Sequence, residues 1–457
     1  MNALEKKVIS KIKPSPNELQ QELEIASKVM AEIKKMKGPH VNVLLCGSLA
    51  RNTHVRKDRD IDIFVQYPKE LTRVEFEKEG LKLGKAVFKN HTWKQQFAEH
   101  PYIRGNIQGY EIEIVPSYKV EKADQLQSAV DRSPFHQAWL EKKLTEEMKD
   151  QVRLLKSFLK GINCYGAKIK VSSMPGYVVE LLIVQYGSFE KCLKAVSIWK
   201  KETIIDLEKQ YETETDTRKK FQHHLIVVDP TDKNRNVASA LSYNQFARFI
   251  AAARAYLKKP SLDFFFENKK HSWPLNKIKK YSAEKNLIVL TMPYTSDMVS
   301  DIVHGQLRRF SKKLKIQLEL NGFNVDRLDD WSDEKQCMAI IIDMHSKTID
   351  QVKNHFGPEV TDKENSEKFL KAHKKSLAGP RIEEGRWVIE KLRKFYQVEK
   401  LIVHACKNNI EKQPLKKALK KSELLNEKKI LALCKKNSEF KKYFTQFLKG
   451  KEEFLDY

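Results

Sequence analysis

The sequence predicts an α+β fold distributed over several domains. The chain has 457 residues, and at about 150 residues per domain this length favours roughly three domains. A hydrophobic fraction of 41% is sufficient to bury real cores, which argues against wholesale disorder. Segments with the apolar spacing of amphipathic helices alternate with short apolar runs typical of strands, and this pattern changes twice along the chain.

The amino-acid composition indicates the class of binding partner and the cellular compartment of the protein. Lys and Arg number 85 against 60 Asp and Glu, a net charge of +25, which favours a polyanion and first of all nucleic acid. The apolar runs are far shorter than the roughly 20 residues that span a bilayer, and no signal peptide is visible, so no membrane partner is expected. The six cysteines are scattered without a CxxC pair, which favours a reduced, cytoplasmic protein without a zinc site.

The first predicted domain, residues 1–130, combines helices with a sheet. Ser15 and Glu18 form a capping box before a helix with one apolar face, and Thr72 and Glu75 form another. Strands are expected at 41–46, 60–67, 93–98 and 110–115, while His100-Pro101-Tyr102 is expected to be a turn.

Three further parts follow. Residues 131–275 are predicted to form a helical domain around a buried helix at 177–186. Residues 276–395 show β-α-β order, with strands at 287–290 and 337–344 and a helix at 297–320, which predicts a ferredoxin-like or RNA-recognition-type fold. Residues 396–457 are expected to form a lysine-rich helical tail.

The most informative segment carries a turn and two nearby aspartates. A Gly47-Ser48 turn follows the first strand, and Asp60 and Asp62 lie on one face of the second. Neighbouring carboxylates repel each other unless a cation lies between them, and their hard oxygens are the ligands that Mg²⁺ prefers. Ser48 and the amides after it, at the start of a short helix, could hold a triphosphate, to which Arg51 would add a positive charge.

A third carboxylate is expected from the strand at 110–115, where Glu111 and Glu113 share one face. Two Mg²⁺ ions about 4 Å apart, held by Asp60, Asp62 and Glu113, would activate a 3′-hydroxyl and stabilise a leaving pyrophosphate. An isolated Asp-x-Asp is commonly an exposed strand face, and Glu111 would then only tune the local field. The Gly-Ser turn before it and the acidic strand after it make the metal interpretation the stronger one.

These motifs resemble those of the DNA polymerase beta-like nucleotidyltransferase superfamily. Longer strings narrow the resemblance to the archaeal, class I CCA-adding enzymes, the tRNA nucleotidyltransferases. It is carried by GSLARNT, DRDIDIFV, EHPYIRG, EIEIVPSYK, SAVDRSPFH, VRLLKSFLKG, YGAK, GYVVELLIVQYGSF and VVDPTDKNRNVA. The match is dense from about residue 15 to 260, looser to about 390, and limited to the abundance of lysine beyond 400.

The resemblance implies roles for individual residues. Asp60, Asp62 and Glu113 match the metal-binding carboxylates of a nucleotidyltransferase palm domain, although the third is usually aspartate and here is glutamate. Arg235 matches the arginine that reads the incoming base beside the tRNA phosphates. Ser48 and Arg51 match residues that bind the nucleotide triphosphate, and so do His136, Lys156 and Tyr165. Gly47 completes the expected nucleotide-binding residues. Without the resemblance, His136, Lys156 and Tyr165 would be taken as a surface histidine, a solvated lysine and a core aromatic, and Arg235 as a salt-bridge partner in a loop.

The leading hypothesis is therefore an Mg²⁺-dependent enzyme that adds C, C and A to the 3′ end of tRNA, using CTP and ATP and no template. The helical domain at 131–275 and the C-terminal domain would grip the acceptor stem and elbow by shape and phosphate contacts, and a homodimer is possible. One alternative is a poly(A) or oligoadenylate polymerase of the same superfamily, which takes ATP alone. The other is a catalytically inactive RNA-binding protein, against which the intact set of site residues argues.

Overall fold

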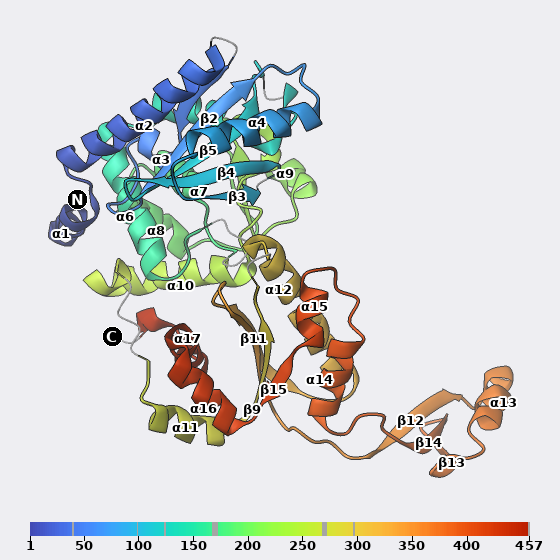
Figure 1. Ribbon diagram of the computed structural model, residues 1–457. Helices are drawn as coiled ribbons and strands as arrows, with labels where there is room; N and C mark the ends of the chain where they lie inside the picture. The colour runs from blue at the N-terminus through green and yellow to red at the C-terminus, as the bar shows by residue number, and fades with distance from the viewer. Residues whose placement is uncertain are drawn as a thin grey trace. The chain divides into compact units, whose positions relative to one another are not determined.

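The computed structural model describes residues 1–38, 41–97, 99–122, 125–166, 172–266, 272–295 and 298–455. The chain forms two compact units, Met1–Lys269 with Glu452–Tyr457, and Lys270–Lys451. Helices and several separate sheets occur in both (Figure 1), which confirms the predicted α+β fold. The finer division at residues 130, 275 and 395 stays a prediction. No helix in the described part of the chain has the length and apolar content that a bilayer crossing requires.

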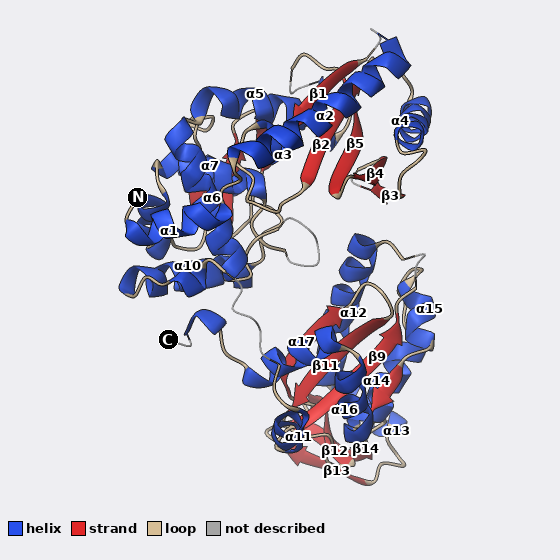
Figure 2. Cartoon of the chain, turned by 60° about the vertical axis from the view of Figure 1, so that its left-hand side comes forward, coloured by secondary structure: helices blue, strands red, loops and turns tan. Residues whose placement is uncertain are grey.

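A five-stranded sheet organises the first part of unit 1, in the order β1-β2-β5-β4-β3. Both predicted capping boxes are present, at the starts of α2 and α4, and apolar side chains of these helices pack on one face of the sheet. Figure 2 shows both helices beside the strands. The elements are α2 Pro16–Lys37, β1 Asn42–Cys46, α3 Gly47–Ala50, β2 Asp60–Tyr67, α4 Arg73–Val87, β3 Trp93–Phe97, β4 Pro101–Ile107 and β5 Tyr110–Tyr118.

One local prediction in this sheet was wrong. The sequence His100-Pro101-Tyr102 was expected to be a turn, but β4 begins at Pro101 and pairs with both β3 and β5. Proline lacks an N–H donor, and the first residue of a strand is a position where this loss is tolerated. The predicted end of β3 at Ala98 lies outside the described residues.

Helices dominate the second part of unit 1 and share one large apolar core. The predicted buried helix is present as α7, which ends at a left-handed Gly187. A small sheet, in the order β6-β7-β8, was not predicted in this region. The elements are α1 Ala3–Ile12, η3 Ala129–Arg132, α5 Ser133–Lys143, α6 Glu146–Gly161, α7 Gly176–Tyr186, α8 Phe189–Ser197, β6 Thr203–Ile205, α9 Glu214–Lys220, β7 Leu225–Asp229, β8 Asp232–Asn236, α10 Tyr243–Lys258, η4 Leu262–Phe264 and η5 Glu453–Leu455.

Unit 2 contains the predicted ferredoxin-like sheet. Its order is β10-β11-β9-β15 and every neighbouring pair is antiparallel, which is the arrangement of a β-α-β-β-α-β fold whose fourth strand is β15. The predicted start of α12 at Asp297 lies outside the described residues. The sheet and its first helix are β9 Asn286–Pro293, α12 Ser300–Leu320, β10 Val325–Ser332, β11 Cys337–Met344 and β15 Glu423–Leu425.

The segment from residue 396 onward was expected to be a helical tail, but it also supplies the edge strand β15. Alternate residues of β9 and β11 point to opposite faces of the sheet and belong to two different apolar cores. Helices from this segment contribute to both cores, so they cover both faces of the sheet. A further three-stranded sheet, β12-β14-β13, is inserted between β11 and α14. The remaining elements are α11 Leu275–Ala283, β12 Val352–Glu359, α13 Lys363–Ala372, β13 Ala378–Glu383, β14 Arg386–Leu392, α14 Val398–Lys407, α15 Leu415–Lys420, α16 Glu427–Lys436 and α17 Ser438–Lys449.

Candidate active site

Two neighbouring parallel strands carry the acidic residues. In the register of β2 and β5, Asp62 lies opposite Glu113 and Asp60 opposite Glu111. The isoleucines that alternate with them are buried in the core on the other face of the sheet. The predicted alternation is therefore present, and the sheet places the acidic side chains of both strands on one face.

Gly47 brings the backbone directly against the Asp62 carboxylate. The strand register places Cys46, at the end of β1, opposite Asp62, and the chain then turns into α3 with Gly47 at a φ of +76°. A Cβ atom on Gly47 would lie 1.9 Å from Oδ2 of Asp62. Glycine is therefore required here both for the left-handed φ and for the close approach. Ser48 follows in the first turn of α3.

The surroundings of Asp62 disfavour the ionised form of its carboxylate, although Arg51 and Arg104 partly oppose this effect. Burial, followed by the nearby charges of Glu113 and Asp60, raises the pKa of Asp62 to about 7. The pKa of Asp60 is also raised, by burial and by Glu111 and Glu113 despite the opposing effect of Arg104. Closely spaced carboxylates whose ionised forms are disfavoured in this way are a common feature of functional sites.

A cavity of about 270 Å³ opens beside these carboxylates. It brings together five of the residues predicted from the sequence, and Tyr177 and Tyr102 complete its polar wall. Asp60, Ser48, Lys156, Tyr165 and Arg235 are described but are not among the residues that line it. The lining comprises Cys46, Gly47, Arg51, Asp62, Phe64, Tyr102, Glu113, Val115, Val130, Ser133, His136 and Tyr177.

Glu113 is held by an arginine that the sequence did not single out. Arg104 lies directly across from Glu113 in the β4–β5 pair, and its Nε donates to Glu113 Oε1 at 2.7 Å while its Nη2 forms an ion pair with the same oxygen. The Tyr102 hydroxyl donates to that oxygen at 3.2 Å, and Arg104 Nη1 reaches Glu111 Oε2 at 3.0 Å. The glutamate that replaces the usual aspartate is thus fixed by its neighbours on β4.

A buried glutamate from α7 organises two of the predicted nucleotide-binding residues. Glu180 is fully buried. Arg51 Nε donates to Glu180 Oε1 at 3.1 Å, and Arg51 Nη2 forms an ion pair with Glu180 Oε2 at 2.9 Å. Lys156 Nζ lies 3.7 Å from Oε1 and donates to the carbonyl of Thr53 at 3.1 Å. Burial opposes the ionisation of Glu180, but Arg51 and Lys156 outweigh it and hold the pKa of Glu180 below its usual value. Burial lowers the pKa of Lys156 to about 8.

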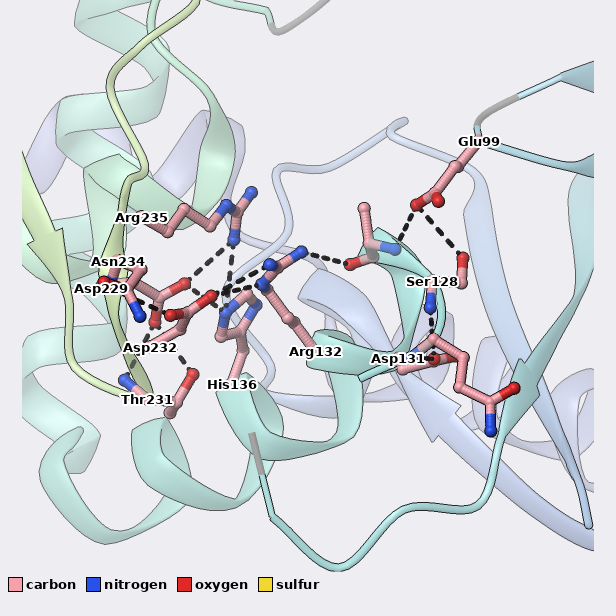
Figure 3. Close-up of polar contacts among 12 residues, drawn as sticks. Glu99, Ser128, Asp131, Arg132, His136, Asp229, Thr231, Asp232, Asn234 and Arg235 are labelled. Carbon is pink, nitrogen blue, oxygen red and sulfur yellow. Dashed lines mark hydrogen bonds and ion pairs between the residues drawn. The ribbon is translucent and has the colours of Figure 1, made fainter. Parts of the chain in front are cut away.

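A second polar group joins α5 to the β7–β8 hairpin (Figure 3). His136 Nε2 lies 2.8 Å from Asp229 Oδ2, and Arg235 Nη1 donates to the same oxygen at 3.0 Å. The His136 ring stacks on Tyr177 with a centroid separation of 4.0 Å. His136 and Arg235, predicted to bind the triphosphate and the base, are therefore neighbours. Tyr165 lies away from this group, beside Lys160, whose Nζ is 5.2 Å from its ring centroid.

Sequence reasoning missed Arg104, Glu180 and Asp229. Glu180 could have been found, because a single charged residue inside an apolar helix demands buried partners. Asp229 ends an apolar strand and gave no such signal. Arg104 lies on a strand that was not predicted.

The residues present fit a divalent metal by the chemistry of their oxygen donors, although their side chains are not arranged as a closed ligand set. Within the described ranges, no three acidic, histidine or cysteine side chains are grouped closely enough to hold a metal ion. Glu113 is instead turned to Arg104. Asp60 and Asp62 nevertheless lie on the same face of the sheet, and burial and neighbouring carboxylates disfavour their ionised forms. A bound cation would offset the repulsion between the carboxylates.

Comparisons with known proteins identify the family. Three family models match the chain: a nucleotidyltransferase domain over residues 26–136, the second domain of tRNA nucleotidyltransferase over 150–266, and the C-terminal domain of CCA-adding enzyme over 286–427. The CCA-adding enzyme of Methanocaldococcus jannaschii is 36% identical over 380 residues, which cover 81% of this chain and 84% of that protein. The chain belongs to the CCA-adding enzyme family.

Other members of the CCA-adding enzyme family show the same extent of similarity. The enzyme of Archaeoglobus fulgidus is 37% identical over 78% of each chain, and that of Methanosarcina mazei is 32% identical over 96% of this chain and 97% of its own. A solved structure of Cid1 poly(U) polymerase aligns at a TM-score of 0.46 and 15% identity, over 58% of this chain and 98% of that one. As a CCA-adding enzyme, the chain is a nucleotidyltransferase that adds CCA to the 3′ end of tRNA without a template, and its superfamily uses divalent metal ions.

Proposed function

We propose that the chain carries out this addition with CTP and ATP as substrates and two Mg²⁺ ions as cofactors, at the site formed by Asp60, Asp62 and Glu113. The observation that carries the proposal is the register of β2 and β5, which pairs Asp62 with Glu113 next to the Gly47 turn. When bound, the two ions would activate the attacking 3′-hydroxyl and neutralise charge on the leaving pyrophosphate.

The chain's own residues would bind and orient the nucleotide. The amides of α3 and the hydroxyl of Ser48, which follows Gly47 at the turn next to Asp62, would hold the triphosphate, and Arg51 and His136 reach the same cavity. Lys156 and Tyr165 do not line this cavity, and their contact with the triphosphate stays a prediction from the resemblance. Arg235 projects from β8 with 38% of its side chain exposed, so that part of its guanidinium could read the base.

The reaction is an in-line transfer at the α-phosphorus. The 3′-oxygen of tRNA forms a bond to that phosphorus while the bond to pyrophosphate breaks, and residues already fixed by buried partners need little reorganisation as the charge develops. Glu113 would be the carboxylate nearest the 3′-hydroxyl. Unit 2 would grip the acceptor stem and elbow of the tRNA by shape and phosphate contacts.

The test uses a tRNA transcript that lacks its last three nucleotides. The protein, Mg²⁺ and this transcript are incubated with CTP, with ATP and with both, and product lengths are read at single-nucleotide resolution. We expect two additions with CTP and a third only when ATP is present. Long tails made from ATP alone would instead favour the poly(A)-type alternative, and the absence of extension despite tight, salt-sensitive binding would favour an inactive RNA-binding protein. A homodimer and a cytoplasmic location stay predictions.

A further inference from the structure

Asp229 is the last residue of β7, at the turn of the β7–β8 hairpin, and several polar groups surround its carboxylate (Figure 3). It is fully buried. Its Oδ1 accepts from the backbone N–H of Thr231 at 3.0 Å and from the Thr231 hydroxyl at 2.9 Å. Its Oδ2 faces His136 Nε2 at 2.8 Å and accepts from Arg235 Nη1 at 3.0 Å. Burial opposes its ionisation, but His136, Thr231 and Arg235 outweigh this and lower the pKa of Asp229 to about 2.

The hairpin has a second attachment to the same helix. Arg132 caps the N-terminus of α5 and lies one turn before His136. Its guanidinium binds Asp232 Oδ2 through Nε and Nη2, both at 2.9 Å. Among the described residues, the outer pair, Arg132–Asp232, makes no hydrogen bond or ion pair with the residues assigned to nucleotide binding. The inner carboxylate, Asp229, touches two of them. Arg132–Asp232 therefore attaches the hairpin to α5, whereas Asp229 also contacts predicted site residues. Variants of Asp232 and Asp229 can thus distinguish attachment of the hairpin from orientation of the site.

Sharing one oxygen makes the positions of His136 and Arg235 interdependent. Their nitrogens lie 3.4 Å apart, held together by Asp229 Oδ2 between them. Arg235 is one of the most flexible side-chain types, and with 38% of its side chain exposed it would sample many rotamers without this anchor. Charge-assisted hydrogen bonds to a buried carboxylate fix the guanidinium plane and so fix which N–H groups are presented outward.

We propose that Asp229 is a positioning residue for nucleotide selection, which holds the base-reading Arg235 and the triphosphate-binding His136 in one fixed arrangement. This inference rests on the roles given to His136 and Arg235 in the proposed function. With His136 on the triphosphate and Arg235 on the base of the same nucleotide, the spacing between the two contacts is fixed. A nucleotide with the wrong base edge is then rejected even though its triphosphate fits.

The experiment compares two isosteric variants of the full chain, Asp229→Asn and Asp232→Asn. Each variant receives a tRNA ending in CC, Mg²⁺ and one of ATP, CTP, GTP or UTP, and kcat and KM are measured for each nucleotide. For Asp229→Asn we expect kcat/KM for ATP to fall about 10- to 100-fold, the effect of one charged hydrogen bond. We also expect the preference for ATP over GTP and UTP to fall about tenfold. Asp232→Asn should lower the melting temperature but keep the preference within about twofold.

A double variant tests whether Asp229 acts through Arg235. When Arg235→Ala is already present, Asp229→Asn should cause no further loss of base preference. Equal effects of Asp229→Asn and Asp232→Asn, or a uniform loss of rate with preference intact, would overturn the inference. If Asp229→Asn fails to fold, as seen in its melting curve and tRNA binding, Asp229→Glu replaces it. That variant keeps the charge but shifts it by one bond, and an unchanged preference would likewise overturn the inference.

The same assay separates this inference from the proposed function. The unmodified protein must add A to the tRNA ending in CC, and its failure to do so contradicts the proposed function itself. If the unmodified protein adds A selectively and Asp229→Asn does so equally well, only the role of Asp229 is wrong.

Discussion

Replacing Gly47 by alanine is the sharpest test of how the site is built. The new Cβ would lie 1.9 Å from Asp62 Oδ2, whereas real Cβ contacts essentially never fall below 3.0 Å. The carboxylate oxygen must therefore move by at least 1.1 Å, unless α3 moves instead. In addition, the φ of +76° disfavours any L-residue by roughly 1–2 kcal/mol.

The displacement gives the expected magnitude. A shift of about 1 Å in a reacting group costs about 100-fold in rate, or about 2.7 kcal/mol of transition-state stabilisation. We expect kcat/KM for CTP addition by Gly47→Ala to fall by this factor. The affinity for tRNA should stay within about twofold, because the substitution lies in unit 1 and leaves unit 2, with its lysine-rich segment from residue 396, unaltered. Incorporation is measured under single-turnover conditions, and tRNA affinity by a binding titration.

Gly187→Ala provides the matched control. Gly187 belongs to the same unit and has a similar φ of +80°, but a Cβ there meets nothing within 4 Å. The alanine in Gly187→Ala has the same unfavourable backbone conformation but does not contact Asp62. This variant should therefore have a lower melting temperature and nearly unchanged incorporation. Full activity in Gly47→Ala, or equal inactivation by Gly187→Ala, would refute the reasoning.

Three other predictions concern the acidic residues. Asp62→Ala should reduce incorporation by more than about 100-fold and leave tRNA binding unchanged. Loss of a residue that only supports a metal ligand costs up to about 100-fold, and loss of a direct ligand should cost more. Normal incorporation by this variant would contradict the metal assignment. Because the folded-state pKa of Asp62 is raised to about 7 above the usual 3.8, the folded state binds the extra proton between these values and the metal-free protein loses stability as the pH rises through them. Asp62→Asn should thus raise the melting temperature in EDTA at pH 8 and change it little at a pH well below 3.8, where Asp62 is protonated in both states. An equal effect at both pH values argues against the buried, crowded carboxylate. Arg104→Gln removes a cation from Glu113 and should lower the Mn²⁺ concentration for half-maximal binding about three- to tenfold, as measured by calorimetry; a higher concentration would mean that Arg104 supports the site.

The sequence could predict the elements whose signals are local. The capping box at Ser15 and Glu18, and the alternation of Asp60 to Ile63, each arise within a few residues, and both are present in the structure. β8 gave no such signal, because its sequence, Asp-Lys-Asn-Arg-Asn, contains no apolar residue. It is a strand only because β7 beside it is buried and offers pairing.

The candidate site was predictable in its acidic residues but not in their partners. Arg104 meets Glu113 because β4 pairs with β5, and this depends on a strand beginning at a proline. Glu180 meets Arg51 across 129 residues of sequence, and Asp229 meets His136 across 93. No periodicity or spacing encodes such long-range pairs, since they follow from packing in three dimensions. The roles given to the individual site residues stay predictions.

The pairing of the site residues with one another bears on how a nucleotide would bind in the proposed site. Among the described residues lining the cavity, Arg51 is the sole lysine or arginine, and it is already paired with Glu180. In the proposed site, an incoming triphosphate would therefore meet the carboxylate of Asp62 and, in Arg51, an arginine whose charge is largely neutralised. Like charges repel strongly in a partly buried site. Divalent ions reverse that repulsion, because they bind the carboxylates and the phosphates at once. The nucleotide and the metal should thus bind cooperatively, with each raising the affinity of the site for the other.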